Sequence, residues 1–197
     1  MLLEFRISNF KSFVEEAVFP MSAAPKQKGL DYSLCREKIK GKVKRGLSTS
    51  VIYGPNASGK TNLIGAMDVL RAIVLRGNIK NVEGISMPNP AAASLELIPN
   101  AHLDGERPVG FAIEFTEGGM CIRYELSIGL GTFIEAGARR KIEREALYVN
   151  GSLIFERTDG LRKEDLKPIE EYGGMKNAIR IGDLIDIASL SLNPEEL

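Results

Sequence analysis

The segment from Gly54 to Thr61 constrains this chain more than any other feature of its sequence. It reads Gly-Pro-Asn-Ala-Ser-Gly-Lys-Thr and fits the pattern G-x-x-x-x-G-K-[ST] at every fixed position. Gly54 and Gly59 permit backbone angles that turn successive N–H groups toward a phosphate. Lys60 adds a positive charge for the β- and γ-phosphates, and the Thr61 hydroxyl is a ligand for Mg²⁺. The motif therefore predicts a phosphate-binding loop (P-loop) for a nucleoside triphosphate.

The elements expected on either side of the loop agree with this interpretation. Ser48 to Tyr53 ends in three apolar residues and is predicted to form a short strand. Lys60 to Arg76 is predicted to form a helix that ends at Gly77-Asn78. Its apolar face is expected to consist of residues at helical spacing: Leu63, Met67, Leu70 and Val74. Strand, loop and helix together disfavour the alternative of a glycine-rich turn with an incidental lysine.

The N-terminal part is expected to contain two further strands and an irregular insertion. Leu3, Phe5 and Ile7 alternate with polar residues and predict a half-buried strand, and Phe13 to Phe19 predicts a second one. Residues 20–47 are punctuated by proline and glycine and are expected to be irregular.

Beyond the helix, the pattern changes to that of an antiparallel meander. Glu117 to Gly119 is predicted to be a three-residue hairpin loop, and Asn150-Gly151 a tight hairpin turn. The strands expected around them are Ser94–Ile98, Phe111–Thr116, Met120–Ile128, Ile142–Val149 and Leu153–Arg157. The tail is expected to be mixed, with a helix over Met175 to Leu190.

These elements predict an α/β fold, a P-loop NTPase core with an antiparallel β-meander. We expect residues 1–80 to form the P-loop core with its insertion at 20–47, residues 94–157 the meander, and residues 158–197 the tail. The 197 residues are close to the upper limit of one ordinary domain, so they are expected to form a single unit.

Composition excludes some classes of function and leaves others open. The 26 basic and 26 acidic residues balance, so the net charge favours neither nucleic acid nor membrane as a partner. No run approaches the apolar length of a membrane span, and we expect a cytoplasmic protein without membrane contact. Cys35 and Cys121 lack zinc-site spacing, and His102 lies in a polar segment typical of a surface loop.

Two segments resemble a known family. Ile7-Ser8-Asn9-Phe10-Lys11-Ser12-Phe13, together with Tyr53 to Ile64, is similar to the ABC-type ATPases of the RecF/SMC branch. The closest resemblance is to the RecF-like AAA-family ATPases, which are related to OLD-type proteins and are often found in phage-defence loci. Two pieces of the meander, Glu145 to Val149 and Phe155 to Arg157, also resemble this family, so the likeness covers about residues 1–157.

The resemblance implies ATP and Mg²⁺ as cofactors, with Lys60 catalytic and Thr61 the metal ligand. It also implies that the nucleotide contacts Lys11 and Ser12 in the Asn-Phe-Lys-Ser turn. The complete set of nucleotide-binding residues that it implies is Lys11, Ser12, Gly54, Pro55, Asn56, Ala57, Ser58, Gly59, Lys60, Thr61 and Asn62.

The chain departs from the family's pattern in three places. Gln27, the only glutamine, precedes the P-loop, whereas the family places a glutamine after the P-loop helix. No Asp-Glu dipeptide follows an apolar run, and the Leu-Ser-Gly-Gly signature is missing. We therefore expect the N-terminal lobe of an incomplete ATPase head, whose second lobe is C-terminal. Alone, this chain is expected to bind ATP without appreciable hydrolysis.

The resemblance implies a second ATPase head as a partner, and an effector protein or a nucleic acid that senses the ATP state. Arg36 to Arg45 carries six basic residues against one glutamate, which indicates either a DNA or RNA contact or a solvated loop. Arg139-Arg140-Lys141 is a second, smaller basic segment. Two alternatives to an ATP-driven machine are a non-hydrolysing nucleotide sensor or scaffold and a P-loop kinase; the meander argues against the kinase.

Overall fold

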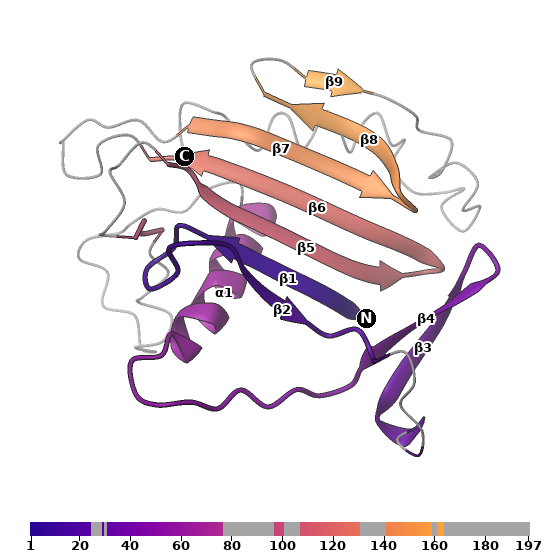
Figure 1. Ribbon diagram of the computed structural model, residues 1–197. Coiled ribbons are helices and arrows are strands. Elements are labelled where there is room, and N and C mark those ends of the chain that lie inside the picture. The colour runs from indigo at the N-terminus through magenta and orange to yellow at the C-terminus, as the bar shows by residue number, and fades with distance from the viewer. Residues whose placement is uncertain are drawn as a thin grey trace.

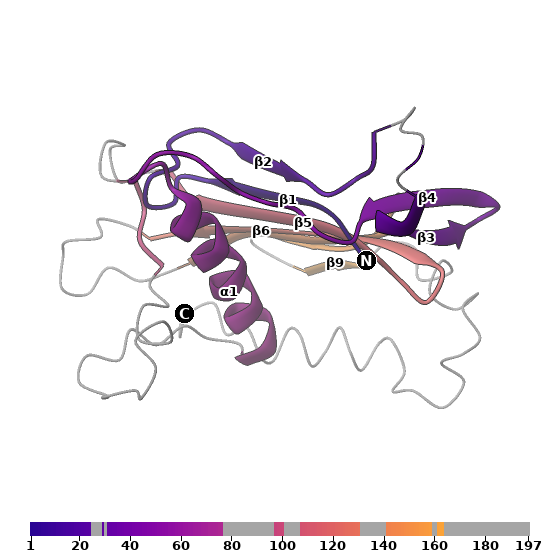
Figure 2. The same cartoon turned by 90° about the horizontal axis from the view of Figure 1, so that it is seen from below.

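The computed structural model describes residues 1–24, 29, 31–76, 97–100, 107–130, 141–158 and 161–163. Its main element is a seven-stranded antiparallel sheet in the order β2-β1-β5-β6-β7-β8-β9, with a separate two-stranded hairpin, β3–β4, beside it (Figure 1). The strands of the sheet are β1 (Leu2–Ser8), β2 (Ala17–Pro20), β5 (Val109–Glu117), β6 (Met120–Gly129), β7 (Lys141–Val149), β8 (Ser152–Arg157) and β9 (Leu161–Lys163). One helix, α1 (Lys60–Arg76), lies against one face of the sheet (Figure 2).

The core lies between α1 and the inward-facing side chains of the central strands. Leu3, Phe5 and Ile7 alternate inward along β1, as their spacing predicted. The main cluster joins Phe5 and Ile7 to the helix and to β5, β6 and β7. Its fully buried members include Phe5, Phe10, Ile73, Val109 and Ile128. Complete burial of a side chain of this size contributes about 1.5–3 kcal/mol, so this cluster fixes α1 on the sheet.

The helix has the predicted bounds, but its buried face is rotated from the predicted one. Leu63 and Leu70 are buried as expected, whereas Val74 is 54% exposed. Ala66, Val69 and Ile73 are buried in its place, so the face that meets the sheet lies on one side of the predicted stripe. The sequence has apolar residues on both sides of that stripe, and the position of the sheet determines which of them are buried. Gly77-Asn78 lies outside the described residues.

Three of the hairpins are closed by two-residue turns, and both residues of each turn have positive φ. Asn150-Gly151 was predicted and is confirmed, with φ values of 53° and 85°. The loop after β5 was predicted with three residues and has two, Gly118-Gly119, because Glu117 pairs with Met120. The third turn, Lys40-Gly41, joins β3 (Leu34–Ile39) to β4 (Lys42–Leu47).

The β3–β4 hairpin overturns the prediction that residues 20–47 are irregular. Its strands carry few apolar residues and showed no apolar alternation, and a lysine is unusual at positive φ, so neither strand nor turn was visible in the sequence. Tertiary contacts support the hairpin instead: Ile39 is buried, the Glu37 carboxylate accepts a hydrogen bond from Gly119 N at 2.6 Å, and Lys44 pairs with Glu114 at 3.5 Å. A short 3-10 helix at Asp31–Ser33 precedes β3.

Three other strand predictions need correction. β2 begins only at Ala17, because Phe13 instead forms an isolated antiparallel bridge with Phe10. Of the strand predicted at Ser94–Ile98, the described residues Leu97 and Ile98 are not in a strand. The strand β9 was not foreseen, and the helix predicted at Met175–Leu190 lies outside the described residues.

The strand predicted at Ser48–Tyr53, directly before the P-loop, is also not formed. Val51 is 80% exposed and Tyr53 is 91% exposed. A strand needs hydrogen-bonded neighbours, and no strand within the described part of the chain pairs with this segment. The apolar residues Val51 to Tyr53 suggested a buried strand, but no described part of the chain covers them.

Candidate functional site

The P-loop connects an extended segment to α1, and its backbone has the conformations that the motif requires. Ala57 and Gly59 have φ values of 64° and 88°, both in the left-handed region that favours glycine. Alternation of right- and left-handed residues makes successive N–H groups converge on a concave surface, which is an anion site. Because α1 begins at Lys60, the positive end of the helix dipole lies at the same place.

The ammonium group of Lys60 lies over the loop. Its Nζ donates hydrogen bonds to the carbonyl oxygens of Gly54 at 2.8 Å and Pro55 at 2.7 Å, and to Ser58 Oγ at 3.3 Å. These acceptors hold the ammonium within the loop, where phosphate oxygens could replace them as stronger, charge-assisted acceptors. Thr61, on the first turn of α1, is exposed to solvent. The residues present therefore fit a phosphate chain and an accompanying cation.

The Asn-Phe-Lys-Ser turn lies beside the P-loop, although 41 or more residues separate them in the sequence. Ser12 Oγ accepts a hydrogen bond from Asn62 Nδ2 at 2.9 Å. The same hydroxyl oxygen would be only 2.7 Å from a Cβ placed on Gly59, so this glycine is needed both for its positive φ and for space. The structure thus brings Ser12, Gly59 and Asn62 together.

Lys11 is held by its backbone, and its side chain has a different neighbour. Its N–H donates to the carbonyl of Ile98 at 3.0 Å, and its carbonyl accepts from Asn100 Nδ2 at 2.6 Å. The ammonium group lies 5.7 Å from the centroid of the Phe10 ring, a cation–π distance. The structure therefore does not show the Lys11 side chain on the P-loop.

Two buried asparagines that the sequence reasoning did not select hold this turn in place. Asn9 is only 3% exposed and has a φ of 49°. Its Nδ2 donates to the carbonyl of Arg107 at 2.5 Å, and its Oδ1 accepts from the N–H of Asn100 at 3.0 Å. Asn100 in turn contacts Lys11, as above. Asn9 belongs to the segment that resembles the family, but its residue type did not predict a buried structural role, and nothing near Asn100 in the sequence marked that residue as important.

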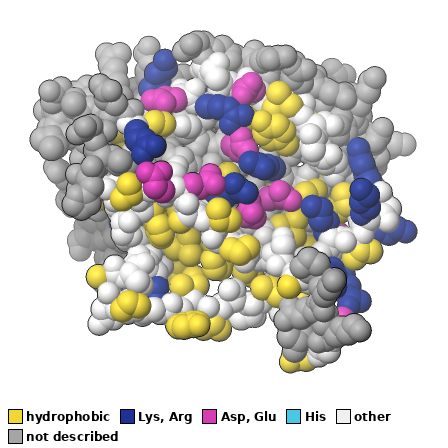
Figure 3. All heavy atoms as spheres, in the orientation of Figure 1, with side chains coloured by type: hydrophobic (Ala, Val, Ile, Leu, Met, Phe, Trp, Pro, Cys, Tyr) yellow, Lys and Arg dark blue, Asp and Glu magenta, His cyan; other side chains and the backbone are white. Residues whose placement is uncertain are grey.

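The face of the sheet opposite α1 carries a network of ion pairs (Figure 3). Arg144 pairs with Glu125 at 2.5 Å and with Glu156 at 2.8 Å, and Arg123 also pairs with Glu125 at 2.5 Å. Burial would raise the pKa of Glu125, but the hydrogen bonds and charges of Arg144 and Arg123 outweigh it and hold this pKa below its usual value. Both acidic members of this network, Glu125 and Glu156, are thus paired with arginine.

Other candidates from the sequence carry no site in the described residues. Cys35 and Cys121 are free thiols, and no group of three or more His, Cys, Asp or Glu within the described ranges could hold a metal ion. His102, Arg139 and Arg140 lie outside the described residues. The part of the chain that the structure covers contains no helix with the length and apolar character needed to cross a membrane.

The sheet, the helix and the loop at its N-terminus define the class of protein: this is an α/β P-loop NTPase, a nucleotide-binding ATPase. The family described as "AAA domain, putative AbiEii toxin, Type IV TA system" matches residues 50–166, more than half of the chain, and the chain belongs to this family. No curated protein matches the chain. P-loop ATPases of the AAA class generally use ATP and Mg²⁺.

Proposed function

We propose that this chain binds ATP–Mg²⁺ through Gly54 to Thr61, as the N-terminal lobe of an ATPase head of the RecF/SMC type. The observation that carries the proposal is the position of Lys60, whose ammonium lies over the P-loop at the start of α1. Backbone N–H groups of Asn56 to Lys60 would contact the phosphates. Lys60 would neutralise charge on the β- and γ-phosphates, and Thr61 would hold Mg²⁺.

Ser12 and Asn62 are proposed to lie at the edge of the nucleotide site. Their hydrogen bond at 2.9 Å supports this placement, because it joins the Asn-Phe-Lys-Ser turn to the first turn of α1. Lys11 would have to leave its contact with Phe10 to reach a phosphate. We therefore rank Ser12 above Lys11 as a nucleotide contact.

The coupling that we propose is between ATP binding and the pairing of two heads, with an effector or nucleic acid sensing the result. The resemblance to RecF-like and OLD-like ATPases supports this step, as well as a role in phage defence. The second candidate is a nucleotide sensor that acts through a partner without hydrolysis. The absence of an Asp-Glu dipeptide and of a glutamine after the P-loop helix favours it for this chain taken alone.

Calorimetric titration of ATP–Mg²⁺ tests the nucleotide site. The substitution Lys60→Ala removes a charge-assisted contact and should weaken binding by about 1.5–3 kcal/mol, roughly 10- to 150-fold. Lys38→Ala removes an equal charge from the exposed hairpin and should leave the affinity unchanged. Unchanged affinity in Lys60→Ala would refute the assignment.

Phosphate release by the same proteins separates the two candidate functions. We expect only a trace rate from the 197-residue chain, since positioning and charge stabilisation supply most of the acceleration in phosphoryl transfer. Turnover near 1 s⁻¹, within the usual enzyme range of roughly 1–10³ s⁻¹, would instead show that this chain contains a complete catalytic set. Lys60→Ala is the blank for this assay.

A further inference from the structure

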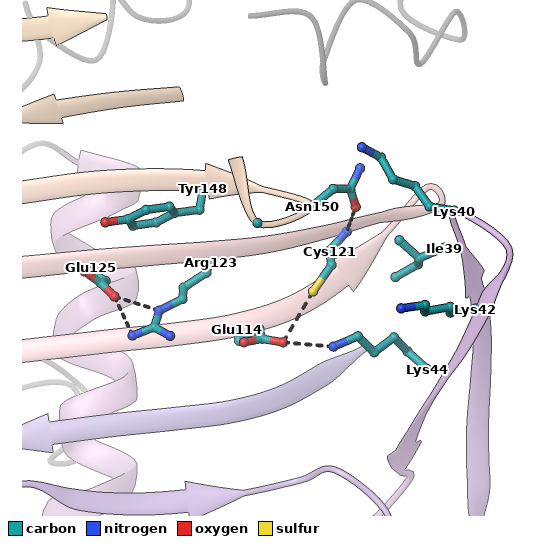
Figure 4. Close-up of a pocket in the computed structure, with 11 residues that line it drawn as sticks. Ile39, Lys40, Lys42, Lys44, Glu114, Cys121, Arg123, Glu125, Tyr148 and Asn150 are labelled. Carbon is teal, nitrogen blue, oxygen red and sulfur yellow. Dashed lines mark hydrogen bonds and ion pairs between the residues drawn. The ribbon is translucent and has the colours of Figure 1, made fainter. Parts of the chain in front are cut away.

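A groove of about 720 Å³ lies between the β3–β4 hairpin and the sheet (Figure 4). The hairpin is at the end of the sheet distant from the start of α1 and the P-loop (Figure 1). One wall is made by Lys40, Lys42 and Lys44 on the hairpin. The opposite side is made by residues of β6 and β7, among them Arg123 and Tyr148. Neither the P-loop nor the Asn-Phe-Lys-Ser turn contributes to this groove.

The register of the hairpin decides which basic residues reach the groove. Lys42 and Lys44 are two residues apart on β4, so they share one face and are spaced by roughly 7 Å. Lys38 is paired with Val43, on the other face of the hairpin, and does not line the groove. The basic segment noted in the sequence is therefore divided, and only part of it lines the groove.

The acidic residues in the groove are already paired. Glu114 contacts Lys44 at 3.5 Å and accepts a hydrogen bond from the Cys121 thiol at 3.3 Å. Glu125 is held by Arg123 and by Arg144 from β7. Lys40 and Lys42 have no carboxylate partner among the described residues. The groove therefore has an excess of positive charge, located on the hairpin wall.

An aromatic side chain, that of Tyr148, lines the side of the groove that the sheet makes. Tyr148 is half-buried in β7, and in Figure 4 its ring lies along the sheet. Its hydroxyl accepts a hydrogen bond from Arg144 Nη2 at 2.9 Å, which fixes the ring on the sheet. The basic segment by itself has no interleaved aromatic residue that could stack on a base. The fold supplies Tyr148, which follows Arg45 by more than 100 residues in the sequence.

We propose that this groove binds single-stranded nucleic acid, with phosphates against Lys40 and Lys42 and one unpaired base against Tyr148. A cationic wall that follows the backbone and an aromatic platform for bases are the two elements of such sites. Its volume lies within the range of roughly 300–1,000 Å³ typical of ligand sites, enough for a nucleotide but not for a duplex. Duplex bases are stacked inside the helix and could not reach the ring.

Fluorescence anisotropy with a labelled 12-nucleotide single strand, as DNA and as RNA, tests the proposal on the nucleotide-free chain over a series of salt concentrations. Each lost phosphate contact lowers the slope of log K against log[salt] by about 0.7 for a single strand. Lys40→Asn with Lys42→Gln should therefore lower it by about 1.4 and weaken binding roughly 20-fold at 0.1 M salt. Asparagine is chosen at position 40 because it tolerates the φ of 44° there.

A second pair of substitutions, Lys38→Gln with Arg71→Gln, is the matched control. It removes the same charge from exposed positions outside the groove and should leave both affinity and slope unchanged. Equal losses in the two pairs would overturn the proposal in favour of unspecific attraction. No binding by the unchanged protein at 50 mM salt would overturn it as well.

Tyr148 distinguishes a base-binding groove from a general polyanion surface. Tyr148→Ala should weaken binding roughly tenfold without changing the salt slope, whereas Tyr148→Phe keeps the ring and should retain affinity. Equal affinity for a duplex of the same length, or displacement by polyglutamate at equal charge, would overturn the proposal. Lys60→Ala should bind the single strand normally, so that failure at this groove and failure at the nucleotide site can be told apart.

Discussion

The substitution Asn9→Gly tests whether the buried asparagine holds the Asn-Phe-Lys-Ser turn beside the P-loop. Glycine accepts the φ of 49° at this position without strain, so the substitution removes the side-chain hydrogen bonds to Asn100 and Arg107, and a longer one to the Pro108 carbonyl, without distorting the backbone. Each buried bond contributes about 1–1.5 kcal/mol, and the greater freedom of glycine in the unfolded chain costs about 0.5–1 kcal/mol. The expected loss in free energy of unfolding is therefore about 3 kcal/mol.

Asn150→Gly is the matched control for this prediction. Asn150 has a similar φ of 53°, but it is less buried, and its Oδ1 accepts a hydrogen bond from Cys121 N at 2.9 Å. Its replacement should cost about 1–2 kcal/mol, again with the added freedom of glycine. Urea unfolding followed by circular dichroism measures both losses.

Amide hydrogen exchange adds a local readout that global stability does not supply. The N–H of Lys11 is bonded to the carbonyl of Ile98, and this bond depends on the connection between Asn9 and Asn100. Under native conditions, exchange at Lys11 should accelerate in Asn9→Gly and stay unchanged in Asn150→Gly. Equal losses of stability in the two variants, or slow exchange at Lys11 in both, would refute the view that Asn9 positions this turn.

Two further predictions concern ionisable groups on the sheet. Burial, the charge of Glu145 and a hydrogen bond to that carboxylate raise the pKa of Tyr124 well above 10. Above pH 10 only the unfolded state releases this proton, so the free energy of unfolding should fall by up to about 1.4 kcal/mol per pH unit. The substitution Tyr124→Phe should remove that dependence on pH. Urea midpoints at pH 8 and 10.5 measure it, and a constant difference between the two proteins would contradict the expectation. Burial and a hydrogen bond to Glu114 raise the pKa of Cys121 to about 11, while Cys35 is exposed. Iodoacetamide at pH 8 should therefore label Cys35 much faster than Cys121, as measured by peptide mass spectrometry. Equal rates would show that Cys121 is more accessible than its contacts indicate.

The local parts of the site could be predicted from the sequence. Gly54 to Thr61 is a contiguous motif whose residue types are dictated by the ligand that it binds, and the helix from Lys60 to Arg76 follows from the spacing of its apolar residues. Asn150-Gly151 was recognised for the same reason, since its two residues suit a turn that needs positive φ at both positions. In each case, the determining interactions lie within a few residues.

The arrangement of distant segments was decided only by the tertiary structure. Lys40-Gly41 forms a turn because contacts of Ile39 and Glu37 with the sheet stabilise the hairpin, although its own residues predicted a loop. Asn100 is important only because the packing of β1 and α1 places it beside Lys11. Tyr148 likewise lines the same groove as Lys42 and Lys44 of β4 because the strand order brings β7 to that groove. A chain encodes its turns and helices through neighbouring residues, whereas contacts across a sheet depend on register and strand order, which no short segment determines.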